Sequence, residues 1–113
     1  MKEGVVYKMT CQRCEEAGKN TLYFGESART SYDRGSEHLA ALKRMDPESP
    51  LVEHHTQDHK ELEPKFKMEV VAFCGTNLLR QAMEANLITT AGLETGVTLM
   101  NRRGEWGEIS PQG

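Results

Sequence analysis

The sequence lacks any long apolar run. No stretch of its 113 residues is apolar enough to span a bilayer, and Lys2 and Glu3 precede only two consecutive valines, which is not the pattern of a signal peptide. These absences predict an intracellular protein. Hydrophobic residues make up 37% of the chain and charged residues 27%, which is typical of one small globular domain with a limited core.

Positive charge is also not in excess. The formal net charge is −3 and the pI is about 5.8. Nucleic-acid binding depends on cations that neutralise phosphates, so this balance argues against a free-standing nucleic-acid binder. Local patches matter more than the sum, and the overall charge therefore does not decide the question.

Cysteine is scarce and odd in number, with three in the chain. Two of them form the pair Cys11-x-x-Cys14. In a reducing compartment, such a pair points to metal or redox chemistry and not to a structural disulfide. No thioredoxin-like helix start follows Cys14, which disfavours the redox alternative. Cys74 follows an apolar stretch and is expected to be a small buried hydrophobe.

The pattern of apolar residues predicts three strands. Residues 4–10 and 21–25 are rich in β-branched and aromatic residues and are expected to pair as an antiparallel hairpin, with a turn over residues 15–20. Residues 65–73 alternate apolar and charged side chains, which predicts a half-buried third strand ending in a core Phe73. The tail from Thr95 onward is expected to be loop-like or partly extended.

Three helices complete the expected fold. Ser31 is a good N-cap for a helix that ends near residue 45, with Leu39 and Leu42 at helical spacing. Gly35 inside it costs about 1 kcal/mol relative to alanine, or marks a close backbone approach. Ser49-Pro50 begins a short helix over residues 50–58, and Thr76 caps a helix over residues 77–90 whose apolar stripe is Leu79, Met83, Leu87 and Ile88. This order predicts an α/β or α+β layer with a small antiparallel or mixed three-stranded sheet flanked by helices.

Five residues are candidates for chemistry on an anionic substrate. Tyr7 and Tyr23 occupy similar positions on two paired strands, and Arg34 and His38 share one face of a helix. An arginine fork and a histidine suit a phosphate, although the same residues also fit amphipathic rings at a sheet edge and a solvated helix face. Glu84 lies beside a buried stripe, so it must be paired, with Arg80 as one candidate, or bound to a divalent cation.

A second group of residues has the spacing of a zinc site. Cys11 and Cys14 form a C-x2-C half-site, and His54, His55 and His59 offer a second half. His55 and His59 share a helix face, so spacing alone slightly favours His55 over His54. The alternative is a surface histidine cluster with two reduced thiols.

These motifs together resemble the GIY-YIG nuclease family. Val5-Val6-Tyr7 resembles the first family motif and Tyr23-Phe24-Gly25 the second, and Arg34 with His38 resembles the arginine-bearing helix. The helix with Glu84 resembles the one that carries the metal-binding glutamate, and Asn101 resembles the asparagine that often follows. Val5 stands in place of the usual glycine, and Gly35 directly follows Arg34.

The resemblance is closest to the nuclease domains of Penelope-like retroelements. It rests on Gly4 to Lys8, the Cys11 and Cys14 pair, Tyr23 to Glu26, and Ser49 to His54, and it covers roughly residues 4–103. That subgroup has a Cys-Cys-His-His zinc motif. The resemblance therefore implies zinc on Cys11, Cys14, His54 and His59. We expect a nuclease-like domain over residues 1–103 and a polar tail over residues 104–113.

The resemblance also implies a function. Glu84 would hold a catalytic Mg²⁺ or Mn²⁺. Tyr7, helped by His38, would act as general base or orient the attacking water, Tyr23 would position the base or the phosphate, and Arg34 would stabilise negative charge. Arg29, Asn101 and Arg102 would contact substrate. The expected activity is nicking of DNA to prime a reverse transcriptase in the same polyprotein, in the nucleus if the element is eukaryotic. The rivals are a non-catalytic zinc-stabilised binding module and an RNA-cleaving enzyme on the same fold.

Overall fold

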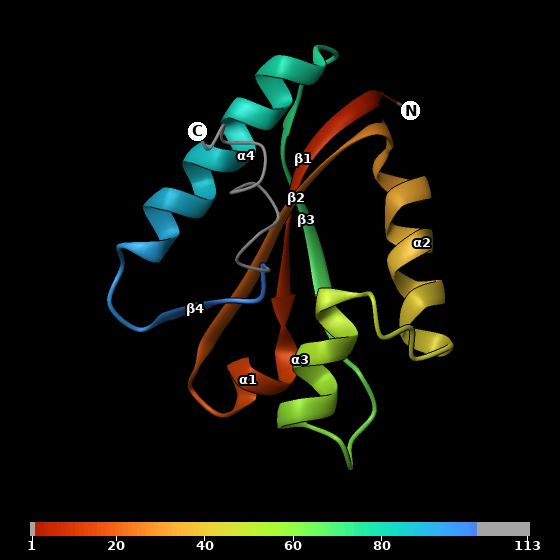
Figure 1. The fold of residues 1–113 in the computed structure, drawn as a ribbon, viewed down its shortest axis with the longest axis vertical. Coiled ribbons are helices and arrows are strands. Elements are labelled where there is room, and N and C mark those ends of the chain that lie inside the picture. Colours follow the sequence, from red (N-terminus) through yellow and green to blue (C-terminus); the bar gives the residue numbers. More distant parts are fainter. Residues whose placement is uncertain (1, 102–113) are drawn as a thin grey trace.

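The computed structural model describes residues 2–101, and their fold is a four-stranded sheet with helices on both faces (Figure 1). The predicted mixed α/β class is confirmed. The predicted tail over residues 104–113 and Arg102 lie outside the described residues. The elements, in chain order, are β1 (Glu3–Cys11), α1 (Gln12–Glu16), β2 (Asn20–Thr30), α2 (Ser31–Lys43), α3 (Pro50–Asp58), β3 (Phe66–Phe73), α4 (Asn77–Gly92) and β4 (Val97–Leu99).

The sheet has one strand more than predicted. Its order is β3-β1-β2-β4, and the extra strand, β4, pairs in parallel with the first residues of β2. Only three residues long, β4 lies in the segment that was expected to be loop-like or partly extended. A strand this short carries too little alternation to be recognised from the sequence.

Strand β1 lies in the middle of the sheet. It pairs antiparallel with β2, where Tyr7 lies opposite Gly25, and antiparallel with β3, where Tyr7 lies opposite Val70. The side chains of Val5 and Val6 point to opposite faces, and both residues are fully buried. The predicted hairpin of the first two strands is therefore confirmed, and its first strand is covered on both sides.

The connection between β1 and β2 differs from the predicted turn. Residues 12–16 form the short helix α1, which places Cys14 in its middle. Strand β2 runs on to Thr30, because its pairing with β1 continues as far as Glu3 opposite Thr30. The predicted N-cap Ser31 is consequently wrong by one residue. The Thr30 side chain instead accepts a hydrogen bond from the Asp33 backbone N–H, at 3.1 Å.

The helices cover the two faces of the sheet unequally (Figure 1). On one face α4 packs on β2 around Leu22, Phe24, Ile88 and Ala91. On the other face, α2 and α3 close the main core, whose members include Val5, Tyr7, Met9, Cys11, Leu42, Leu51 and Val52. No helix within residues 2–101 has the length and apolar character needed to cross a membrane.

Several residues expected in the core are exposed. Phe73 is 51% exposed, Leu39 54% and Leu79 52%, so these expectations are wrong. Cys74 is half-buried, not enclosed. For Phe73 the reason is the position of α4, which packs against β2 and β1 and leaves the end of the outer strand β3 uncovered.

A buried arginine fixes the start of α4 to the sheet. Arg80 is only 2% exposed, and its Nε donates to Glu26 Oε1 at 2.9 Å. Its Nη1 donates to the carbonyl oxygen of Cys74 at 2.9 Å, and its Nη2 donates to the Asn77 side chain. These bonds join the first turn of α4 to β2 and to the residue that follows β3.

Replacing Arg80 with alanine is expected to lower the free energy of unfolding by about 3 kcal/mol, because it leaves the Glu26 carboxylate and a buried carbonyl without their partner. Urea unfolding followed by circular dichroism measures this loss. The matched control is Arg44→Ala, which removes an ion pair to Asp46 from an arginine that is 63% exposed and should change stability by less than about 1 kcal/mol. Equal effects of the two substitutions would contradict this role of Arg80.

Candidate functional site

The hydroxyl of Tyr7 is the centre of a buried polar cluster. The Tyr7 ring is fully buried on β1, and its oxygen lies 2.8 Å from His38 Nε2 and accepts a hydrogen bond from Arg34 Nε at 3.0 Å. The Tyr23 ring lies 6.4 Å from the Tyr7 ring and 5.9 Å from the His38 ring, measured between centroids. Four of the five residues singled out for chemistry on an anion therefore lie together. They are Tyr7, Tyr23, Arg34 and His38.

Helix α2 supplies both partners of Tyr7. Arg34 and His38 are one turn apart, so both side chains point from α2 toward β1. Gly35 lies between them in sequence, and a Cβ there would be 3.2 Å from Met68 Sδ. This tight contact agrees with the expected close backbone approach. A larger residue at position 35 would require the Met68 side chain to move.

Gly25 makes room for the Tyr7 hydroxyl. The two residues are directly opposite in the β1–β2 ladder, and a Cβ at position 25 would lie 2.4 Å from the Tyr7 oxygen. Any side chain there would displace the ring. The glycine of the second motif is thus required by packing against the tyrosine of the first.

Burial keeps the tyrosine and the histidine neutral. It raises the pKa of Tyr7 to about 12, an effect that the Arg34 charge only partly opposes. Burial, together with the positive charge of Arg34, lowers the pKa of His38 to about 4. Near pH 7 the Tyr7 hydroxyl therefore keeps its proton, His38 is neutral, and Arg34 is the charged member of these three residues.

Two carboxylates lie within electrostatic reach of this cluster. After burial, which is the main cause, the charges of Glu84 and Glu26 contribute to the raised pKa of Tyr7. Glu84 is half-buried on α4, and Glu26 on β2 is held by Arg80. Arg80, considered from the sequence as a partner for Glu84, donates to Glu26. The structure thus brings Glu84 close to Tyr7 although the two belong to distant parts of the chain.

The cluster opens into a cavity of about 370 Å³. Tyr23, Arg34 and His38 line one part of it, and residues between α2 and α3, including Arg44 and Ser49, line the rest. Glu37 also lines the cavity, accepts from Arg34 Nη1 at 2.8 Å and forms an ion pair with Arg29. The charge of Arg34 is therefore shared between the Tyr7 oxygen and a carboxylate.

Cysteine and histidine side chains gather at the C-terminal end of β1. Cys11 ends β1, Cys14 lies in α1, and His54 and His59 come from α3 and the residue that follows it. Their ligand atoms all lie within 4.8 Å of one another, and Cys14 Sγ is 3.4 Å from His54 Nε2 and 3.3 Å from His59 Nε2. Two thiols and two imidazoles at this spacing fit a tetrahedral zinc ion.

The cluster contains His54, so the slight preference for His55 drawn from spacing is wrong. Helix α3 ends at Asp58, so His59 leaves the helical path and the rule that pairs positions four apart does not apply. His55 is 2% exposed and its Nε2 lies 2.8 Å from the carbonyl oxygen of Leu62. It belongs to the core and closes the loop that follows α3.

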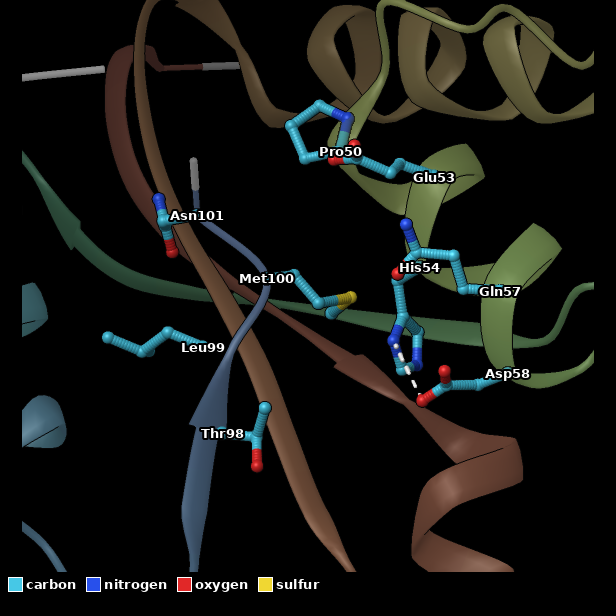
Figure 2. Close-up of a pocket in the computed structure, with 9 residues that line it drawn as sticks. All are labelled: Pro50, Glu53, His54, Gln57, Asp58, Thr98, Leu99, Met100 and Asn101. Atoms are coloured by element: carbon cyan, nitrogen blue, oxygen red, sulfur yellow. Dashed lines mark ion pairs between the residues drawn. The ribbon is translucent and has the colours of Figure 1, made fainter. Parts of the chain in front are cut away.

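Asp58 orients the ring of His54. Its Oδ2 lies 3.5 Å from His54 Nδ1, and Figure 2 shows the pair on one side of a cavity of about 300 Å³ between α3 and β4. Burial lowers the pKa of His54, which favours the neutral ring that binds a metal. With Nδ1 turned to Asp58, Nε2 faces the cysteines, as in many carboxylate–histidine–zinc arrangements.

Of the three residues expected to contact substrate, Asn101 and Arg29 lie in the described part of the chain. The Asn101 amide bonds twice to the backbone of Phe24, accepting from its N–H at 3.0 Å and donating to its carbonyl at 2.8 Å, so it extends the sheet beyond β4. Arg29 is tied to Glu37. Contact of Asn101, Arg29 or Arg102 with substrate stays a prediction.

Sequence reasoning missed several residues of these sites. Glu37 follows Arg34 by three positions and Asp58 follows His54 by four, and both spacings signal helix neighbours. The role of Gly25 beneath Tyr7, in contrast, depends on strand register, which the sequence does not fix by itself.

In comparisons with known proteins, no family model, no curated protein and no solved structure matches this chain.

The chain is expected to bind one zinc ion tightly. His54→Ala should nearly abolish binding, and Asp58→Asn should weaken it by about 10- to 100-fold, because His54 then loses the group that orients its ring. Competition with a chromogenic chelator measures the affinity, and the absorption of a Co²⁺-substituted sample reports tetrahedral thiolate coordination. The control Cys74→Ser removes a cysteine outside the cluster and should change neither.

Acid is expected to destabilise the fold through His38. Because its pKa falls from 6.5 to about 4 on folding, the unfolded chain binds more protons between these values. The stability that depends on neutral His38 is complete above about pH 6.5 and is lost as the pH falls toward 4, by on the order of 3 kcal/mol. Urea unfolding of the parent and of His38→Gln from pH 7.5 to about 4.5 isolates this effect, and parallel pH profiles would contradict it.

Proposed function

We propose that this protein is a divalent-metal-dependent DNA endonuclease that nicks one strand. The observation that carries the proposal is the Tyr7 hydroxyl held between Arg34 and His38, within electrostatic reach of Glu84. This grouping joins residues that are spread over the chain and that were singled out for phosphate chemistry by residue type and by resemblance to the GIY-YIG nucleases.

The neutral state of the cluster supports a proton relay. Tyr7 with a pKa of about 12 stays protonated near pH 7, so it can take a proton from water only while it gives its own away. His38 Nε2, at 2.8 Å, is the acceptor that this requires. The water oxygen then bonds to phosphorus, the bond from phosphorus to the leaving oxygen breaks, and the leaving oxygen takes up a proton from solvent. The water proton passes to Tyr7 as the Tyr7 proton passes to His38.

The charged residues act on the phosphate. Glu84 is half-buried close to Tyr7, and a carboxylate in that position fits Mg²⁺ or Mn²⁺, which prefer oxygen ligands. When bound there, the ion would act as a Lewis acid on a phosphate oxygen. Arg34 lines the cavity and already donates to the Tyr7 oxygen, so it supports negative charge on both the phenol and the phosphate. Tyr23 lines the same cavity and positions these groups.

The setting that best fits the resemblance is a Penelope-like retroelement, in which the nick supplies a primer for reverse transcription. Because the net charge is −3, this module by itself would bind DNA weakly. A reverse transcriptase domain of the same polyprotein would provide much of the DNA affinity. This setting places the protein inside the cell, in the nucleus of a eukaryotic host.

A second function is favoured by the zinc cluster. Cys11, Cys14, His54 and His59 hold together β1, α1 and the end of α3 without using Tyr7, Arg34 or Glu84. A zinc-stabilised module that binds nucleic acid or protein needs this cluster alone. The nuclease therefore requires Glu84, whereas the binding module does not.

The decisive measurement is nicking of supercoiled plasmid in Mg²⁺ or Mn²⁺. The parent should convert it to open circles, and Glu84→Gln and Tyr7→Phe should each lower the rate by about 100-fold or more, since one removes the metal-binding carboxylate and the other the proton relay. Glu94→Gln, at an exposed position after α4, is the matched control and should retain full activity.

Zinc content and circular dichroism establish that each variant is folded. A folded, zinc-loaded parent that leaves the plasmid supercoiled would overturn the nuclease and favour the binding module. Cleavage of RNA in preference to DNA in a competition experiment would move the proposal to the RNA-cleaving rival.

A further inference from the structure

The free edge of the sheet is formed by β3. This strand is the first in the order β3-β1-β2-β4, so it has a hydrogen-bonded neighbour on one side only. No proline interrupts its eight residues. A bare edge of this length is a template for another strand.

The ladder with β1 fixes which backbone groups of β3 point outward. The Gln12 N–H donates to the Lys65 carbonyl at 2.8 Å, just beyond the pair Cys11–Phe66. In an antiparallel ladder, such a bond flanks a pair that is itself not hydrogen-bonded, and the two kinds of pair alternate. Lys67 and Glu69 therefore bond to β1, whereas the N–H and C=O groups of Phe66, Met68 and Val70 point away from the sheet.

These outward groups have no partner in the described part of the chain. No backbone hydrogen bond within residues 2–101 reaches the outward N–H and C=O groups of Phe66, Met68 or Val70. The side chain of Val70 is 37% exposed at the same edge, and Leu39, which lines a cavity with Phe66 and Met68, is 54% exposed. The edge thus offers both backbone groups and apolar surface.

The charges on β3 are complementary to a second copy of the same strand. Lys67 and Glu69 flank Met68 and lie on one face. If two copies pair antiparallel about Met68, each Lys67 lies directly opposite the Glu69 of the other copy, and Phe66 lies opposite Val70. This register satisfies the outward backbone groups, and of the registers that do so near Met68 it is the one that places Lys67 opposite Glu69, at the closely spaced, non-hydrogen-bonded positions where side chains interact best.

We propose that two copies of this chain associate through their β3 edges into one continuous sheet, with the two-fold axis passing through the Met68 pair. This goes beyond the proposed nuclease and does not depend on it. Residues directly opposite in an antiparallel ladder lie on the same face. Both Tyr7 clusters and both zinc clusters therefore face the same side of the joined sheet, and a nuclease so arranged presents two active sites to one duplex.

Charge reversal and its rescue test the register. Lys67→Glu places two carboxylates opposite each other at both symmetry-related positions, and Glu69→Lys places two amines there. Each is expected to raise the dimer dissociation constant, measured by analytical ultracentrifugation, by about tenfold or more. The double variant Lys67→Glu with Glu69→Lys restores opposite charges and should recover the parent affinity.

The charge variants are expected to change association without changing folding. Lys67 and Glu69 are exposed, and their ion pairs with Glu15 and Lys8 are on the surface, so the variants should fold as the parent does. Hydrogen exchange of the amides of Phe66, Met68 and Val70 should slow in the dimer. The proposal is overturned if the parent stays monomeric at every concentration, or if the double variant dimerises as weakly as the single variants. A monomeric parent would instead favour pairing of the β3 edge with a strand from a different protein.

Discussion

The placement of β1 in the centre of the sheet is the constraint on which the rest of the structure depends. This strand carries Tyr7 in its middle and Cys11 at its end, and the two side chains emerge on the same face because they are four residues apart. With a rise of about 3.4 Å per residue, the candidate active site and the metal cluster are separated by roughly 13 Å along one rigid strand. Flanking strands on both sides hold it straight.

A shared strand explains why a zinc site accompanies the polar cluster. The cavity beside Tyr23 and His38 is walled in part by Ser49 and Pro50, which begin α3. His54 lies within α3 and His59 directly after it, and a metal held by these two residues with Cys11 and Cys14 would tie α3 to β1. In a small domain with a limited core, such a metal would fix the position of α3. It would thereby also fix the first residues of α3, which line the cavity.

Much of the fold follows from sequence patterns, but the burial of individual residues does not. Alternation and N-cap signals placed the helix over residues 50–58 and the strand that ends at Phe73, with bounds close to those observed. Phe73 and Leu79 were nevertheless expected in the core and are half exposed, because their burial depends on where α4 crosses the sheet. That crossing is set by the ion pair of Arg80 with Glu26, two residues far apart in sequence.

The candidate sites were predictable to different degrees. Spacing identified the cysteine pair, but it favoured His55 over His54 as a metal ligand. That preference assumed that His59 continues the helix, whereas α3 ends at Asp58. Resemblance to a zinc-bearing nuclease subgroup pointed to His54, which lies in the cluster. The environment of Tyr7 was not accessible from sequence, since an ordinary phenol becomes a very weak acid only through burial among residues from α2 and β2.

The contact between Tyr7 and Gly25 also bears on how the chain finds its native pairing. A slip of the β1–β2 hairpin by one residue would set Tyr7 opposite Phe24 or Glu26 in place of the glycine, and would turn one strand's apolar face outward. A slip by two would set it opposite Tyr23 or Ser27, each of which carries the Cβ that Gly25 lacks. Gly25 therefore favours the native register of the hairpin, because only in that register does the Tyr7 ring lie opposite a residue without a Cβ.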